Sequence, residues 1–288
     1  NGESVEGSGL ENLVNDSGLD AEDQHSVEAA DMWLASAPEG EPLWIQFDLG
    51  QIYKLHQMLV WNYNVQFELL LGFGIRDVTV EYSDNGSDWT TLGDFELAQA
   101  TATSDYVSNT TIDFGGVPAR YVRLTVNSGW GGSGQFGLSE VRFTYIPAQP
   151  REPEPADGVT NVDPDVTLTW RAGREADMHE VYLGTDPNAP LLVDTVDAAS
   201  YVPTDLLFGE TYYWQVVEVN EADEIATWPG PIWNFMVRQY ATIDDFESYT
   251  DDLEAGEAIF DTWLDGYVNE TGSVVGYFEA PFTENTIV

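Results

Sequence analysis

The sequence predicts an all-β protein made of tandem β-sandwiches, and three observations carry this prediction. The run Leu43–Leu49 reads LWIQFDL, and its alternation of apolar and polar residues is the period of a strand with one buried face. Similar short runs recur as far as residue 237, separated by Gly-, Asn- and Pro-containing turns. A proline-rich segment divides these runs into two groups, which indicates more than one domain.

The first group of strands begins with Leu43–Leu49 and continues after a break at Gly50. The run Leu55–Trp61 has apolar residues on both faces, so we expect it to be a central strand of a sandwich. An Asn-Gly turn within Ser83–Ser87 favours positive φ angles and predicts a hairpin. Three further strands are predicted at Arg76–Ser83, Tyr121–Val126 and Gly137–Tyr145.

Together these motifs resemble the discoidin domain, which is also called the coagulation-factor C-type domain. The matching features are Trp33, the strand Trp44–Gly50, the hairpin Val80–Trp89 and the closing segment Tyr121–Val141. The resemblance covers residues 1–146 and implies a discoidin-like jelly roll with a galactose-binding fold, which binds ligands through loops at one end. The family has an opening strand before its first loop, and no such strand is visible in residues 1–42.

A stiff linker is predicted at residues 147–157, because the segment IPAQPREPEPAD contains four prolines. Residues 158–238 then form a second β unit that resembles a fibronectin type III domain, on the runs VTLTW, HEVYLGT and GETYYWQV. This resemblance implies that Trp170 lies in the core. It also implies that Tyr212 lies at a corner where its hydroxyl ties the chain.

Residues 239–288 are predicted to start a third β-sandwich, a partial jelly roll. The opening DDFESY resembles the first strands of modules that accompany discoidin and fibronectin modules in large bacterial surface proteins. About 50 residues are too few to close a sandwich. We therefore expect both ends of the sequence to be cut from a longer chain.

Charge narrows the possible partners. Asp and Glu number 51 against nine Lys and Arg, for a net charge of −42. This excludes nucleic acid bound by phosphate neutralisation, and it disfavours anionic membranes. Neutral glycans and cations remain suitable, and a merely solvated acidic surface is the alternative. The chain has no cysteine and no apolar run of about 18 residues, so we expect no disulfide and no membrane insertion.

A calcium site is predicted in the acidic loop Asn12–Asp23. Asn15, Asp16 and Ser17 offer the amide, carboxylate and hydroxyl oxygens that Ca²⁺ prefers. Related glycan-binding discoidin modules hold a structural Ca²⁺ here, and the resemblance implies that Glu140 completes the ligand set. The chain reads Asp-Ser-Gly where the family often reads Asp-Gly, which shifts the ligands by a residue. A solvated acidic loop is the alternative.

Carbohydrate-binding residues are predicted in two loops. Asn62, Tyr63 and Asn64 fall in one loop that binds ligand in the family, and Trp130 and Phe136 fall in another. Sugar rings stack on exposed aromatic side chains, while amides bind their hydroxyl groups. The alternative is that the aromatic residues close the open end of the sandwich.

No catalytic site is predicted. The three histidines are scattered, and pairs of carboxylates are too common in so acidic a chain to indicate a glycosidase. Four N-x-S/T sequons offer possible glycosylation, at Asn15, Asn85, Asn109 and Asn269.

The sequence therefore indicates a secreted or cell-surface protein that binds extracellular carbohydrate or matrix without catalysis and serves in adhesion. Two alternatives remain. The chain is a structural subunit of a filament or surface layer, in which copies assemble head to tail by exchanging β-strands. Otherwise it is the accessory region of a glycan-degrading enzyme whose catalytic domain lies outside this sequence.

Overall fold

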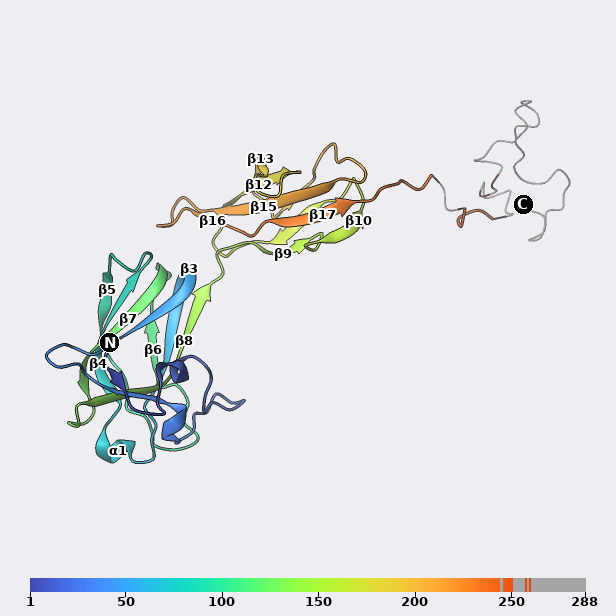
Figure 1. The fold of residues 1–288 in the computed structure, drawn as a ribbon. Helices are drawn as coiled ribbons and strands as arrows, with labels where there is room; N and C mark the ends of the chain where they lie inside the picture. The colour runs from blue at the N-terminus through green and yellow to red at the C-terminus, as the bar shows by residue number, and fades with distance from the viewer. Residues whose placement is uncertain (244–245, 251–256, 258, 260–288) are drawn as a thin grey trace, which may run out of the picture.

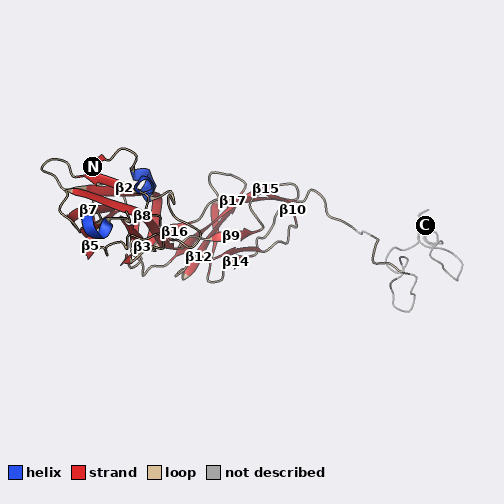
Figure 2. Ribbon diagram, turned by 90° about the horizontal axis from the view of Figure 1, so that it is seen from below, coloured by secondary structure: helices blue, strands red, loops and turns tan. Residues whose placement is uncertain are grey.

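The computed structural model describes residues 1–243, 246–250, 257 and 259 and consists almost entirely of strands (Figure 1). Two β units follow one another along the chain, and the view of Figure 2 shows the same succession. This confirms the predicted all-β architecture. The predicted third unit, residues 239–288, lies almost wholly outside the described residues. None of the helices in the described part is long and apolar enough to cross a membrane.

The N-terminal unit is organised around one long strand, β3 (Trp44–Asn62). Its first part pairs with β7 and its last part pairs with both β8 and β6. The two strands predicted on either side of Gly50 are therefore one bent strand. Gly50 has a φ of +85°, and the register with β7 shifts between Asp48 and Tyr53. Because of this bend, the two parts of β3 serve two layers of the same sandwich.

The other elements of the N-terminal unit complete these layers in the order β1-β2-β8-β3-β7-β4-β5, with β6 against β3. The predicted central position of the second part of β3 is confirmed, because Met58 and Val60 are fully buried between paired neighbours. The strands are β1 (Glu3–Ser4), β2 (Trp33–Ser36), β4 (Ile75–Ser83), β5 (Thr90–Glu96), β6 (Thr110–Asp113), β7 (Pro118–Gly129) and β8 (Gln135–Ile146); the helical turns are η1 (Leu10–Leu13), η2 (Ala29–Asp31) and α1 (Glu68–Leu71).

An opening strand is present, although none is visible in residues 1–42 of the sequence. Strand β1 is only two residues long, but it pairs with β2, which in turn pairs with β8. A two-residue strand leaves no alternating pattern in the sequence, which is why the sequence did not reveal it. This unit therefore does not need a strand from a neighbouring copy. Nothing in the described residues supports head-to-tail assembly.

The second unit is a smaller β-sandwich. One sheet has the order β14-β11-β9, and the other has the order β10-β17-β15-β12-β13, with β16 against β15. Trp170 is 5% exposed and packs edge-on against Trp214, as predicted. The hydroxyl of Tyr212 accepts a hydrogen bond of 3.0 Å from the Leu207 amide, which ties the corner as the resemblance implied. Its strands are β9 (Arg151–Glu154), β10 (Val159–Val162), β11 (Leu168–Arg171), β12 (Met178–Gly184), β13 (Leu191–Val196), β14 (Ser200–Tyr201), β15 (Thr211–Val219), β16 (Thr227–Pro229) and β17 (Trp233–Val237).

Part of the predicted linker belongs to this second unit. Strand β9 falls inside residues 147–157 and pairs antiparallel with β11. Its one proline, Pro153, is tolerated because β9 is an edge strand, where a missing backbone N–H costs no ladder hydrogen bond. The connection between the two units is therefore shorter than predicted and runs from Pro147 to Pro150.

Candidate functional site

Three loops meet at the end of the N-terminal unit that carries α1, away from the second unit (Figure 1). With the adjoining ends of β3, β7 and β8, they comprise residues 62–74, 97–104 and 127–139. Backbone hydrogen bonds join Gly131 N to Gly72 O (2.7 Å) and Trp130 N to Gly74 O (3.0 Å). The Trp130 indole N–H donates to Leu97 O at 3.1 Å and adds the third loop. These contacts make one continuous surface, which we call the neutral loops.

The neutral loops contain a single acidic or basic residue, Glu68, and its side chain is buried. Its carboxylate accepts hydrogen bonds from the amides of Phe73 (2.9 Å) and Gly74 (3.0 Å) and from the Gln99 side chain (3.3 Å). Burial raises the pKa of Glu68 in spite of these three hydrogen bonds. The carboxylate fixes the loops from inside. No exposed charged side chain belongs to the loops themselves, and the nearest cation is the Arg76 guanidinium of β4, which lies against Trp130.

Apolar side chains project from the neutral loops around α1. Leu70 is 83% exposed, Leu69 67% and Phe67 60%. Trp130 is half-buried, and the Arg76 guanidinium carbon lies 5.1 Å from its ring centroid. Phe136 is half-buried as well. Trp130 and Phe136 are therefore only partly exposed, and Phe136 also packs against the core of the domain. Their contact with sugar stays a prediction.

The other three predicted sugar-binding residues lie in the interior, and this part of the prediction is corrected. Asn64 is fully buried, and its amide nitrogen donates to the carbonyls of His25, Ser26 and Thr103. Asn62 donates in the same way to two carbonyls, while Tyr63 is 2% exposed and its pKa is raised to about 12 by burial and by the charge of Glu68. The two asparagine side chains satisfy backbone groups of neighbouring loops, and all three side chains are buried, so a ligand does not reach them.

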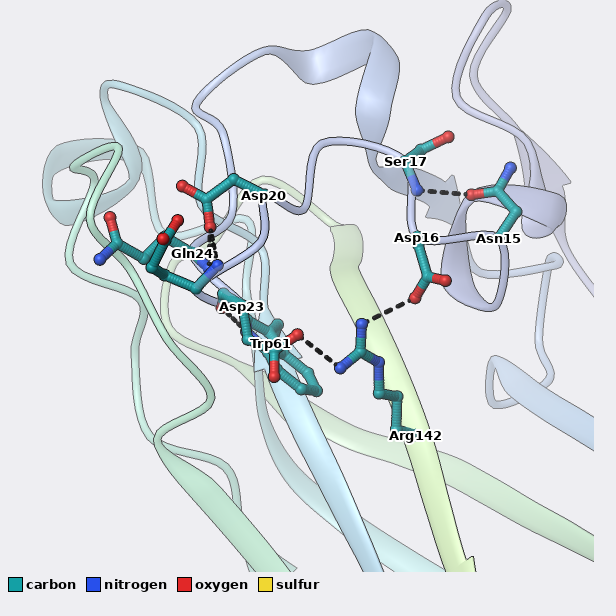
Figure 3. Close-up of polar contacts among 9 residues, drawn as sticks. Asn15, Asp16, Ser17, Asp20, Asp23, Gln24, Trp61 and Arg142 are labelled. Atoms are coloured by element: carbon teal, nitrogen blue, oxygen red, sulfur yellow. Dashed lines mark hydrogen bonds and ion pairs between the residues drawn. The ribbon is translucent and has the colours of Figure 1, made fainter.

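The acidic loop that precedes η2 is tied to strand β8 (Figure 3). Arg142 forms ion pairs with Asp16 (2.8 Å) and Asp23 (2.6 Å), and its guanidinium carbon lies 5.2 Å from the Trp61 ring centroid. The Asn15 side-chain oxygen accepts a hydrogen bond of 2.9 Å from the Ser17 amide. Two of the predicted calcium ligands therefore already have partners within the protein.

Glu140 lies beside this loop and is the carboxylate that most needs a cation. Its side chain is 1% exposed, and Oε2 has no hydrogen-bond partner among the described residues. Burial and the nearby charge of Asp16 raise the pKa of Glu140 to about 7, against the opposing effects of Arg142 and the Asp16 amide. An orphaned buried carboxylate oxygen beside a second carboxylate is the environment that a bound cation relieves. The residues present thus fit a calcium ion.

The structure groups these residues less tightly than a preformed metal centre would. Within the described residues, no cluster of three or more His, Asp or Glu side chains has the arrangement of a metal site. A calcium ion would therefore draw most of its oxygens from backbone carbonyls, amides and hydroxyls, with Glu140 and Asp16 as the carboxylates.

Sequence reasoning missed Glu68 and Arg142 as parts of these sites. Glu68 was detectable as the lone charge in three otherwise uncharged loops, whereas no local pattern marks Arg142.

Of the predicted glycosylation sites, Asn15, Asn85 and Asn109 are exposed, and Asn269 lies outside the described residues. The amide of Asn109 is engaged, because it donates to Gln99 O and accepts from the Tyr106 hydroxyl.

Comparison with solved structures finds partial likenesses to this chain. A module from a family 31 glycoside hydrolase of Clostridium perfringens, CBM32-3, is 16% identical, with 49% of this chain and 94% of that chain covered and a TM-score of 0.34. The C. perfringens module CpGH89CBM32-5, in complex with GalNAc-β-1,3-galactose, is 14% identical, with 46% and 86% covered and a TM-score of 0.33. An Fn3-like protein from Clostridium thermocellum is 21% identical, with 34% and 99% covered and a TM-score of 0.27.

Comparison at the level of sequence gives a family for the N-terminal unit. No curated protein matches the chain. The sequence profile of the F5/8 type C domain matches residues 4–141, from β1 to the middle of β8. The match includes the signature residues Trp33 and Trp89 and both halves of the bent strand β3. Residues 4–141 of this chain are therefore an F5/8 type C domain, the discoidin family that the motifs indicated.

Proposed function

We propose that the F5/8 type C domain binds a neutral carbohydrate outside the cell through the neutral loops, without catalysis, and that this attaches the protein to a glycan-bearing surface or matrix. One observation carries the proposal. In a chain with a net charge of −42, the loops at the end of this domain expose no charged side chain of their own. Binding of a neutral ligand there desolvates no charged group of the ligand or of these loops.

The chemistry of the neutral loops suits a sugar. Phe67 and Trp130 offer aromatic faces on which the C–H face of a pyranose ring stacks. Thr101, Thr103 and Ser133 are exposed and supply hydroxyl groups that exchange hydrogen bonds with sugar hydroxyls. Since Glu68 fixes the loops from inside, little conformational entropy is lost on binding.

A structural Ca²⁺ is part of the same proposal. Glu140 and Asp16 would hold it as carboxylates, and Asn15 and Ser17 would add neutral oxygens. Its positive charge would neutralise the buried Glu140 and stabilise the acidic loop. Because Asp16 is bonded to Arg142, the cation and the guanidinium would compete for that carboxylate.

The test is binding of residues 1–288 to a glycan array, followed by calorimetry with the best neutral ligand; N-acetylgalactosamine is the first single sugar to try. Trp130→Ala should weaken binding by about 1–3 kcal/mol, the scale of one aromatic contact. Leu191→Ser, which changes an exposed apolar residue of the second unit, is the matched control and should leave affinity unchanged.

Two results would contradict the proposal. One is an array without any hit for a folded protein. The other is a ligand whose affinity drops equally in Leu191→Ser and Trp130→Ala, because the neutral loops would then not be the site.

A further inference from the structure

The only lysine of the chain lies at the junction of the two β units. Lys54 follows the bend of β3, and its side chain is 11% exposed. Its ammonium group donates to Glu175 Oε2 at 2.5 Å and to Asp223 Oδ2 at 2.6 Å. Both acceptors belong to loops of the second unit, one before β12 and the other after β15. A single cation of the first unit is thus held by two acids of the second.

The short connection between the units is packed against the second unit. The carbonyl of Pro147 accepts a hydrogen bond of 2.7 Å from the Arg174 amide. The Gln149 side chain donates to Pro229 O at 3.0 Å. Ala148 is 7% exposed, and Gly173 lies so close that a Cβ there would come within 2.0 Å of the Ala148 carbonyl oxygen. The connection therefore has little freedom to act as a hinge.

Charge makes the Lys54 contact more important than one exposed ion pair. The chain has 51 acidic residues, so two units brought together repel each other unless a cation lies between them. Without the ammonium group of Lys54, the carboxylates of Glu175 and Asp223 would face the first unit without this partner. Burial disfavours the charged form of Lys54, but the bonds to Asp223 and Glu175 outweigh it and raise its pKa, so the group stays charged.

From this geometry we infer that Lys54 locks the two β units into one rigid body, in which the neutral loops face away from the second unit. Linked domains ordinarily move relative to each other unless their interface is extensive. Here a packed connection and the two ion pairs of the largely buried Lys54 ammonium group replace an extensive interface. Figure 1 shows this arrangement, with α1 at the end of the first unit opposite the junction. The lock fixes the direction in which the neutral loops are presented, whatever ligand they take.

Spin-label distances across the junction test the lock. The chain contains no cysteine, so Thr91→Cys in the first unit and Thr195→Cys in the second, both exposed positions, give one clean pair of labels in residues 1–288. Double electron–electron resonance should give one narrow distance distribution. Adding Lys54→Met, which keeps the aliphatic length and removes the charge, should widen it at least about twofold.

The matched control is Arg171→Met, which removes an exposed ion pair with Glu152 inside the second unit and should leave the width unchanged. A second variant, Glu175→Gln with Asp223→Asn, keeps Lys54 and should widen the distribution as well. This variant decides the question if Lys54→Met fails to fold. A parent distribution as wide as that of a folded variant would overturn the lock.

Lysine chemistry gives an independent measurement. An amine-acetylating reagent can modify only Lys54 and the α-amino group, so mass spectrometry reads the reactivity of one side chain. Lys54 should react several-fold more slowly in the parent than in the Glu175→Gln, Asp223→Asn variant, with the α-amino group as internal reference. Equal rates would show that the ammonium group is free in solution and would also overturn the lock.

Discussion

The guanidinium carbon of Arg123 lies 3.8 Å from the centroid of the Trp89 ring. The Trp44 ring also contacts this guanidinium, with a centroid distance of 4.9 Å, and the Gln46 side chain accepts a hydrogen bond of 2.9 Å from it. Trp44, Trp89 and Arg123 come from three separate signature segments of the family. Their contact joins β3, β7 and the β4–β5 hairpin on the outer face of the sheet, which gives these residues a structural reason to occur together.

Arg123→Lys should therefore lower the free energy of unfolding of the F5/8 type C domain by about 1–2 kcal/mol. The lysine ammonium group keeps the positive charge, but it has no planar face to stack on the two indoles. Urea denaturation of residues 1–288 measures the change. Arg171→Lys, in an exposed ion pair, should cost less than about 0.5 kcal/mol. Equal losses for both variants would contradict a stabilising clamp.

Asn64→Ala should destabilise the same domain by at least about 2 kcal/mol, because three carbonyls lose their shared donor inside the protein. Trp130→Ala should instead change glycan binding more than stability. Thermal unfolding and calorimetry on both variants separate the two roles. An Asn64→Ala protein with unchanged stability and lost binding would restore Asn64 as a ligand-contacting residue.

The pH dependence of stability should include a contribution from Glu68, whose pKa is raised by burial. Below about pH 4 the carboxyl is protonated in both folded and unfolded chains and contributes nothing. As the pH rises above this value, the unfolded chain ionises first, so the folded state becomes relatively less favourable. Between pH 4 and 6, the free energy of unfolding measured with urea should therefore fall by less in Glu68→Gln than in the parent. Parallel profiles would contradict a raised pKa.

Calcium should raise the melting temperature of the F5/8 type C domain, and chelator should lower it. At a free concentration 100 times the dissociation constant, the gain is about 2.7 kcal/mol. Glu140→Gln should abolish the effect, whereas Glu28→Gln, an exposed acid near the same loop, should retain it. Identical melting curves with Ca²⁺ and with chelator would contradict the metal site.

The sequence by itself determined the architecture of the F5/8 type C domain and much of the second unit. Alternation in Leu43–Leu49 marks a strand with one buried face. The resemblance of the second unit to a fibronectin type III domain placed Trp170 in the core and Tyr212 at the corner, where the structure has them. Such patterns reflect backbone periodicity, which neighbouring residues specify.

Only the tertiary structure decided what the polar side chains do. Asn64 reads as a surface amide in a loop, but it is buried because residues near positions 25 and 103 fold over it and leave carbonyls that need a donor. Lys54 reads as an ordinary surface lysine in a strand, but it meets two acids that are 121 and 169 residues away in sequence. Hydrogen bonds and ion pairs join whatever groups the fold brings within reach, and no local pattern records those partners.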